Sequence, residues 1–200
     1  MKKSVLANIF SDIPTLETDR LILRRLSVSD ADDMYDYSKD ANVTKFLTWS
    51  PHPDRYYTID YIKFVQKKYK TGDFRDWAVI DKASGKMIGT CGFTSVELNN
   101  KKAEIGYVYN PEFWGRGIAT EALSRVIEFG FSRLDLNRIE GRFMVENIPS
   151  RHVMEKCGMT FEGIHREYLL IKEKYRDIGI CAILRSEYEK SKGESNGIQA

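Results

Sequence analysis

A glycine-rich loop in the middle of the chain carries the clearest candidate chemistry. Its residues are Gly115, Arg116, Gly117, Ile118, Ala119 and Thr120. Apolar residues after it recur with helical spacing, so the loop opens a helix. A helix that begins in glycines leaves its first N–H groups unpaired at the positive end of its dipole, where anions, most often phosphates, bind. The glycines let a ligand approach the backbone closely, and Arg116 can add a charged hydrogen bond.

The loop departs from two common nucleotide-binding patterns. The Walker pattern needs Gly-Lys-Ser/Thr, but Gly117 is followed by Ile118, which argues against a nucleotide P-loop. The dinucleotide pattern G-x-G-x-x-G requires a third glycine where Thr120 stands. A glycine-rich turn between a strand and a helix can also bind nothing, and this alternative stays open at this point.

Metal and thiol chemistry find little support in the sequence. The cysteines are Cys91, Cys157 and Cys181, and the histidines are His52, His152 and His165. No disulfide framework and no metal-ligand spacing can be drawn from them, so we expect no metal site. A Cys–His nucleophile stays open, although buried structural thiols are far commoner.

The elements that would position the loop can be read from local patterns. Residues 103–109 have the β-branched and aromatic content of a buried strand, which Asn110-Pro111 ends, and the helix after the loop runs to Phe131. Near the N-terminus, residues 16–26 alternate as a strand does, and Ser29 with Asp32 resembles a capping box. The acidic residues there complement the helix dipole or bind a cationic substrate; they are Asp30, Asp32, Asp33 and Asp36.

The remaining elements follow from the same kinds of signal. We expect helices over residues 59–69 and 151–159, and strands over residues 76–81, 86–96, 138–145, 163–171 and 174–184. Residues 41–58 read as an irregular aromatic loop that either walls a substrate pocket or packs on the core. Residues 190–200 read as a polar, frayed tail.

Length and composition indicate one soluble domain spanning residues 1–200. The 200 residues are 42% hydrophobic and 30% charged, with a net charge of +2. That charge is too small to indicate nucleic-acid binding, and no basic run accompanies it. Because no apolar run approaches a membrane span and no signal peptide is recognisable, we expect no membrane association and a cytoplasmic location.

Three segments in the right order resemble one family. YNPEFWGRGIATEAL resembles the acyl-CoA-binding motif of the GCN5-related N-acetyltransferases, Gln/Arg-x-x-Gly-x-Gly/Ala, with Gly117 and Ala119 at the small positions. Trp114 replaces the Gln/Arg, as in the ribosomal-protein N-acetyltransferase branch. ENIPSRHVMEKCGMTFEG and the pair Glu167-Tyr168 resemble two further family segments. The resemblance covers about residues 15–188.

The resemblance implies a fold and a donor site. The fold is a mixed α/β sheet, twisted and splayed between the strands at Ala103 and Arg138, with helices on both faces. Acetyl-CoA would lie in the splay, its pantetheine arm bonded to the backbone of Tyr107, Val108 and Tyr109. Its pyrophosphate would sit on the Gly115–Thr120 loop. Asn147 would hold the pantetheine amide, unless it is only a turn residue.

The resemblance also implies catalytic roles for direct attack in a ternary complex. The Tyr109 N–H would stabilise the oxyanion. Ser150 would protonate the leaving thiolate, unless it merely caps its helix. Glu167 is our first choice of general base and Glu104 the second, although either can be a simple ion-pair partner.

These features together favour an acetyl-CoA-dependent N-acetyltransferase that modifies a primary amine, such as a ribosomal-protein N-terminus. A small amine acceptor (a polyamine, an amino acid or an antibiotic) is the first alternative. A non-catalytic CoA-binding module and a plain nucleotide-binding protein stand further behind. The chain would act as a monomer or as a homodimer.

Overall fold

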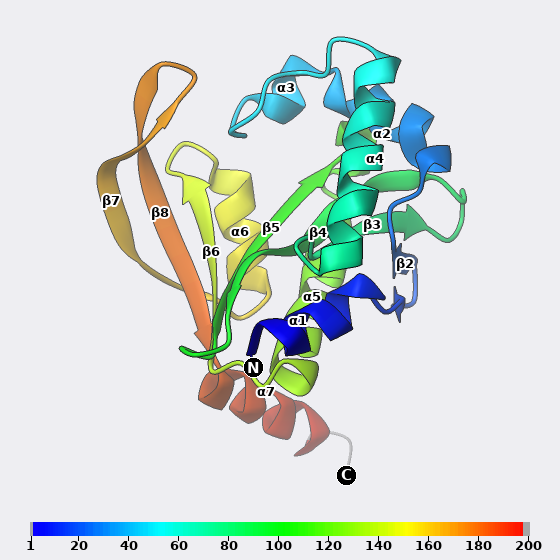
Figure 1. Cartoon of the computed structure of the whole chain (residues 1–200). Helices are drawn as coiled ribbons and strands as arrows, with labels where there is room; N and C mark the ends of the chain where they lie inside the picture. The colour runs from blue at the N-terminus through cyan, green and yellow to red at the C-terminus, as the bar shows by residue number, and fades with distance from the viewer. Residues whose placement is uncertain (1, 198–200) are drawn as a thin grey trace. The chain divides into compact units, whose positions relative to one another are not determined.

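The computed structural model describes residues 2–197 and has a mixed α/β architecture (Figure 1). Its elements are α1 (Lys2–Ser11), β1 (Leu16–Glu17), β2 (Leu21–Arg24), η1 (Val28–Asp30), α2 (Ala31–Ser38), α3 (Ala41–Thr44), α4 (Arg55–Thr71), β3 (Asp76–Asp81), β4 (Met87–Glu97), β5 (Lys102–Tyr109), η2 (Pro111–Phe113), α5 (Ile118–Arg133), β6 (Arg138–Met144), α6 (Ile148–Lys156), β7 (Thr160–Ile171), β8 (Lys174–Leu184) and α7 (Arg185–Gly197). The described part thus confirms the expected mixture of strands and helices. None of its helices is both long enough and apolar enough to span a membrane.

Eight strands form one mixed sheet in the order β1-β2-β3-β4-β5-β6-β8-β7. The β5–β6 pair is parallel and joins Lys102–Ile105 to Arg138–Gly141. The chain divides into two compact units, the first comprising residues 2–94 and 106–126, the second residues 95–105 and 127–197. The expectation of one domain over residues 1–200, and that of a splay between β5 and β6, stay predictions.

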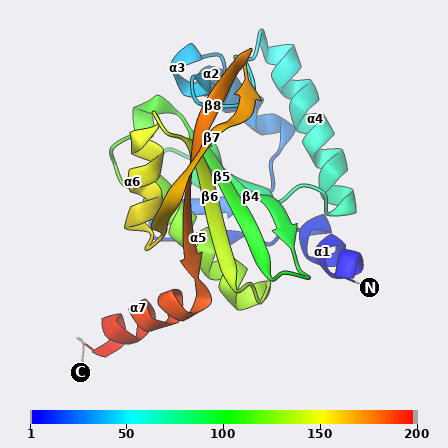
Figure 2. The ribbon, with the colours of Figure 1, turned by 90° about the vertical axis from the view of Figure 1, so that its left-hand side faces the viewer.

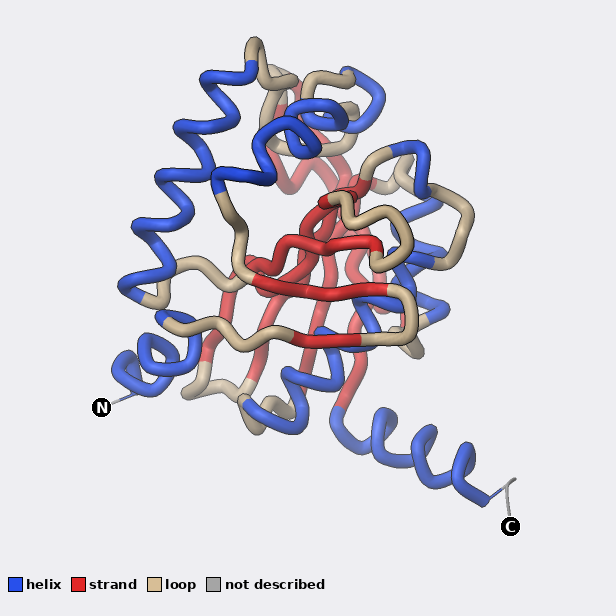
Figure 3. The backbone as a smooth tube through the Cα atoms, turned by 90° about the vertical axis from the view of Figure 1, so that its right-hand side faces the viewer, coloured by secondary structure: helices blue, strands red, loops and turns tan. Residues whose placement is uncertain are grey.

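The first unit begins with a short strand ladder. β1 pairs with β2 and β2 with β3, all antiparallel, and Figure 3 shows β1 and β2 as neighbouring strands joined by a short turn. Leu21 and Leu23 are fully buried on one face of β2, which confirms the alternation in the sequence. The expected single strand over residues 16–26 is wrong, because residues 18–20 turn the chain between β1 and β2.

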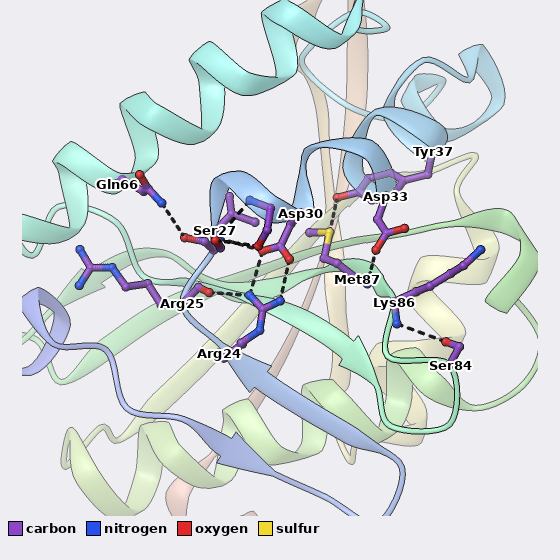
Figure 4. Close-up of polar contacts among 12 residues, drawn as sticks. Arg24, Arg25, Ser27, Asp30, Asp33, Tyr37, Gln66, Ser84, Lys86 and Met87 are labelled. Carbon is purple, nitrogen blue, oxygen red and sulfur yellow. Dashed lines mark hydrogen bonds and ion pairs between the residues drawn. The ribbon is translucent and has the colours of Figure 1, made fainter.

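The helix start near residue 29 is wrong by two residues. The capping box is formed by Ser27 and Asp30, so that Ser29 lies inside η1. Asp30 is buried and accepts two hydrogen bonds from the Arg24 guanidinium, at 2.8 and 2.6 Å (Figure 4). Asp33 accepts the Met87 N–H at 2.9 Å, so both carboxylates are engaged within the protein.

The aromatic stretch over residues 41–58 is more regular than expected. It contains α3, and α4 already begins at Arg55, because the Asp54 side chain caps it by accepting the Tyr57 N–H. His52 is buried, with its Nδ1 2.9 Å from Thr58 Oγ1, and burial lowers its pKa. Tyr56 and Tyr57, in contrast, are exposed. Part of the stretch therefore packs on the protein and part faces outward.

The second unit is built on the antiparallel β6, β8 and β7. β8 lies between the other two, and α6 contacts all three strands (Figure 2). α6 begins at Ile148, three residues before the expected start, because Pro149 occupies its first turn. The expected frayed tail is wrong for residues 190–197, which belong to α7. Residues 198–200 lie outside the described part of the chain.

Candidate functional site

The glycine loop has the backbone that the sequence predicts. Gly115 and Gly117 adopt φ angles of 73° and 76°, which disfavour side chains with a Cβ. Within α5, the Glu121 N–H donates to the Gly117 carbonyl at 3.0 Å. The helix therefore starts directly after the second glycine, with the first turn of N–H groups at the positive end of its dipole.

Two side chains at the start of the loop have partners within the first unit. Arg116 is exposed, and its guanidinium lies 5.3 Å from the centre of the Phe113 ring, on the preceding turn. Trp114, at the position of the family's usual Gln/Arg, donates its indole Nε1–H to the Tyr109 carbonyl at 2.9 Å. This bond ties the turn at η2 to the end of β5.

Residues Tyr107–Tyr109 form the last part of β5, in the same unit as the loop. The side chain of Tyr109 is buried, whereas Tyr107 and Val108 are half-buried. Gly89 of β4 lies against this segment, and a Cβ at Gly89 would be 2.2 Å from the Val108 carbonyl oxygen. Only a glycine permits so close an approach of the two strands.

Sequence reasoning missed three residues that hold the loop. Thr18 and Arg20, in the turn between β1 and β2, both bind the carboxylate of Glu121 in the first turn of α5. Arg20 also donates to the Arg116 carbonyl at 3.0 Å. No local signal could have paired them, because about one hundred residues separate the partners.

Asn147 and Ser150 lie together at the start of α6, in the second unit. Asn147 is the N-cap, and its Oδ1 accepts the Ser150 N–H at 3.4 Å. The alternative that Ser150 caps its own helix is therefore wrong, because Asn147 occupies that position. Both side chains are half-buried.

The two candidate bases have different surroundings within the second unit. Glu104, on β5, is half-buried, and its Oε2 lies 3.5 Å from Nε of Arg142. Arg142 also pairs with Glu140 at 3.1 Å. Glu104 is therefore part of an ion-pair network that extends along β6.

Glu167 lies in β7 where the register with β8 shifts, between His165 and Leu169. Its φ of 49° is unusual for a residue with a Cβ. The Asp177 carboxylate accepts its N–H at 2.7 Å, and its side chain is exposed. The guanidinium of Arg142 lies 5.6 Å from the centre of the Tyr168 ring, so Arg142 contacts both Glu104 and the residue after Glu167.

The described residues contain no group of three or more His, Cys, Asp or Glu side chains placed to hold a metal ion. Cys91 and Cys181 are buried, and burial raises the pKa of the Cys181 thiol to about 11. A thiol with so high a pKa is a poor nucleophile at neutral pH.

Comparisons with known proteins identify the family of the chain. Residues 20–160 match the acetyltransferase (GNAT) domain family, and the chain belongs to this family. It is an N-acetyltransferase that uses acetyl-CoA.

Its relatives include the uncharacterised N-acetyltransferase p20 of Bacillus licheniformis, with 36% identity over 87% of this chain and 98% of the relative. A putative ribosomal N-acetyltransferase of Bacillus subtilis, YdaF, is 35% identical over 54% of this chain and 59% of its own. Among solved structures, spermidine N-acetyltransferase of Vibrio cholerae in complex with CoA and spermine matches with a TM-score of 0.73 and 25% identity, covering 86% of this chain and 99% of that one.

Proposed function

We propose that this enzyme acetylates the free amino group of a protein N-terminus. The observation that carries the proposal is the surface of the β7–β8 hairpin around Glu167. This hairpin exposes several large apolar side chains, among them Ile164, Tyr168, Leu169, Leu170 and Tyr175. Leu170 is 63% and Tyr175 66% exposed.

Such a surface fits a polypeptide better than a small polyamine. Exposed apolar patches on single chains commonly mark binding surfaces for proteins or peptides. A polyamine offers several positive charges along a thin chain, and its binding site needs spaced carboxylates rather than leucine and tyrosine. The relationship to the putative ribosomal N-acetyltransferase supports the same class of acceptor.

On the donor side, we assign the pyrophosphate of acetyl-CoA to the Gly115–Thr120 loop. The positive φ angles of both glycines and the helix start at Ile118 support this assignment. The pantetheine arm would bond to the backbone of Tyr107, Val108 and Tyr109, and to Asn147.

The proposed reaction is direct attack of the amine on the thioester carbonyl. Glu167 takes the proton from the attacking amine, and the new C–N bond forms as the Tyr109 N–H stabilises the oxyanion. When the C–S bond breaks, Ser150 donates a proton to the CoA thiolate and regains one from solvent, to which Glu167 releases the proton that it took. Glu167 is preferred over Glu104 because it is exposed, whereas Glu104 is half-buried and pairs with Arg142.

A small amine is the second candidate acceptor, because the spermidine N-acetyltransferase neighbour was solved with spermine. That protein is similar to this chain over most of its length. The cytoplasmic location and the state as a monomer or homodimer stay predictions.

The test is a panel of acceptors at a fixed concentration of acetyl-CoA, in which release of the CoA thiol measures turnover. The panel contains short lysine-free peptides beginning with Ser or Ala, the same peptides with a blocked N-terminus, and spermidine. We expect turnover with the free peptides and none with the blocked ones. A kcat/KM for spermidine that exceeds every peptide value would overturn the protein acceptor and favour the second candidate.

A further inference from the structure

We propose that Arg20, held by Thr18 and Glu121, is a positioning residue for the donor loop: it sets the direction of the loop's N–H groups toward the phosphates of acetyl-CoA. We call these three residues the clamp. The inference rests on the proposed placement of the pyrophosphate on the Gly115–Thr120 loop. All residues involved belong to the first unit.

Arg20 binds two parts of the loop region at once. Its Nη1 donates to the Arg116 carbonyl at 3.0 Å, and its Nε donates to Glu121 Oε2 at 2.6 Å. Nη2 lies 2.6 Å from the same carboxylate oxygen. A guanidinium has a rigid planar fork of donors, so these bonds fix the carbonyl relative to the first turn of α5.

The second carboxylate oxygen of Glu121 is also bound by the turn between β1 and β2. Its Oε1 accepts the Thr18 hydroxyl at 2.5 Å and the Arg20 backbone N–H at 3.0 Å. Partial burial acts to raise the pKa of this carboxyl, but the bonds from Thr18 and Arg20 outweigh it and lower the pKa. Glu121 therefore stays ionised and keeps the Arg20 guanidinium in place.

The carbonyl that Arg20 holds determines where the next N–H points. In a trans peptide the C=O and the following N–H point in opposite directions, and the described chain has no cis peptide bond. Fixing the Arg116 carbonyl toward Arg20 therefore turns the Gly117 N–H away from the clamp. Gly117 has a positive φ and no side chain that would restrict its backbone. The hydrogen bond from Arg20 to the Arg116 carbonyl supplies that restriction instead.

The clamp also removes a charge conflict. Glu121 lies in the first turn of α5, where its negative charge would compete with a phosphate for the positive helix end. The Arg20 partner neutralises the carboxylate and holds it on the side of the β1–β2 turn. The loop can then bind an anion without repulsion from its own helix.

The test compares two acetyl donors that differ only beyond the pantetheine. Acetyl-CoA carries the pyrophosphate, and S-acetylpantetheine carries no phosphate. For Arg20→Ala we expect the KM for acetyl-CoA to rise about tenfold with kcat nearly unchanged. The kcat/KM for S-acetylpantetheine should stay at the wild-type value, and Arg20→Lys should recover part of the loss.

Arg185→Ala is the matched control. Arg185 also donates to a main-chain carbonyl, that of Phe131, and pairs with a carboxylate, Asp135, each at 3.0 Å. It lies in the second unit, away from the donor loop in sequence. We expect this variant to leave both donors' kinetics unchanged. If Arg20→Ala does not fold, Arg20→Lys and Thr18→Val are measured in its place.

Gly117→Glu separates the two ways in which the idea can fail. If Gly117→Glu raises the KM for acetyl-CoA alone and the Arg20 variants do not, the clamp is wrong and the loop assignment stands. If neither Gly117→Glu nor the Arg20 variants change the preference for acetyl-CoA over S-acetylpantetheine, the clamp and the loop assignment are both wrong. An equal loss with both donors for Arg20→Ala would show a general structural role and overturn the positioning role.

Discussion

The donor loop and the β7–β8 hairpin are constructed in opposite ways. The loop is tied by side chains of a distant turn, so that the Arg116 carbonyl and Glu121 each have partners near the N-terminus. The hairpin is held mainly by its own backbone ladder and leaves Ile164, Leu170 and Tyr175 exposed. The loop is thus fixed by side chains from another segment, whereas the hairpin keeps several large apolar side chains exposed.

This difference corresponds to the two binding tasks of the proposed reaction, which are to hold the acetyl donor and to hold the amine acceptor. The chain uses acetyl-CoA as its donor, so a preformed loop would fit the part of the proposed reaction that binds this ligand. Acceptors differ among relatives, whose names include both a ribosomal and a spermidine acetyltransferase. The exposed side chains of the hairpin make few contacts within the protein. Substitutions there can therefore alter the acceptor preference without disturbing the donor loop.

The largest effect should come from the hairpin. Replacing Glu167 by Gln removes the proposed general base, and we expect kcat to fall by about 10²–10⁴-fold with a nearly unchanged KM for acetyl-CoA. Steady-state kinetics at the optimal pH measure both. A loss of less than about tenfold would remove Glu167 from the role of base.

Glu104→Gln is the companion variant. We expect it to lower activity much less, because its partner is Arg142 in the ion-pair network along β6. The reverse order of the two effects would transfer the role of base to Glu104 and place the chemistry on β5 rather than on the hairpin.

A second prediction concerns the stability of the unit that carries the donor loop. The Asp76 Oδ1 is buried without a hydrogen-bond partner among the described residues, and burial raises the pKa of this carboxyl to about 7. The folded state then holds this proton more tightly than the unfolded state does. Between about pH 4 and pH 7 the folded chain carries more protons, so stability falls as the pH rises.

The expected loss reaches on the order of 4 kcal/mol by pH 8, because each pKa unit corresponds to about 1.4 kcal/mol. Urea unfolding at a series of pH values measures it. Asp76→Asn should remove this part of the pH dependence, whereas the exposed Asp60→Asn should not. Parallel pH profiles for wild type and Asp76→Asn would contradict the prediction.

The smallest effect should come from the apolar hairpin surface. Leu170→Ser and Tyr175→Ser should raise the KM for a peptide acceptor about three- to tenfold and leave the KM for acetyl-CoA unchanged. Because both side chains are exposed, the free energy of unfolding should change by less than about 0.5 kcal/mol. An unchanged peptide KM in both variants would show that the acceptor does not contact this surface.

Local patterns predicted most of the helices and strands, and the family resemblance predicted the mixed α/β fold. β5 follows from the β-branched and aromatic content of residues 103–109, and the glycines at positions 115 and 117 predict the loop and the start of α5. The helix start near residue 29 shows the limit of such patterns. Ser27-x-x-Asp30 and Ser29-x-x-Asp32 both fit a capping box, and the bond from Arg24 to Asp30 accompanies the first choice.

The site was less predictable, because its geometry depends on interactions between distant segments. Family motifs pointed to Asn147 as a cofactor-binding residue and to Ser150 and Glu167 as catalytic residues, and these roles stay predictions. No pattern indicated the bonds from Thr18 and Arg20 to Glu121, since sequence spacing carries no information about partners so far apart. The positive φ of Glu167 also depends on the register shift with β8, which a single strand does not reveal.

The Trp114 indole has a practical consequence for experiments. Trp114 is one of three tryptophans, and the residue is 53% exposed, whereas Trp77 is fully buried. Trp114 lies directly before the donor loop, with its N–H on the Tyr109 carbonyl. If acetyl-CoA binds the Gly115–Thr120 loop as proposed, it should change the solvation of this indole, and we expect the fluorescence emission to shift on donor binding. The enzyme would thus carry its own optical reporter, and Trp114→Phe, which leaves the signal of Trp49 and Trp77 in place, supplies the control.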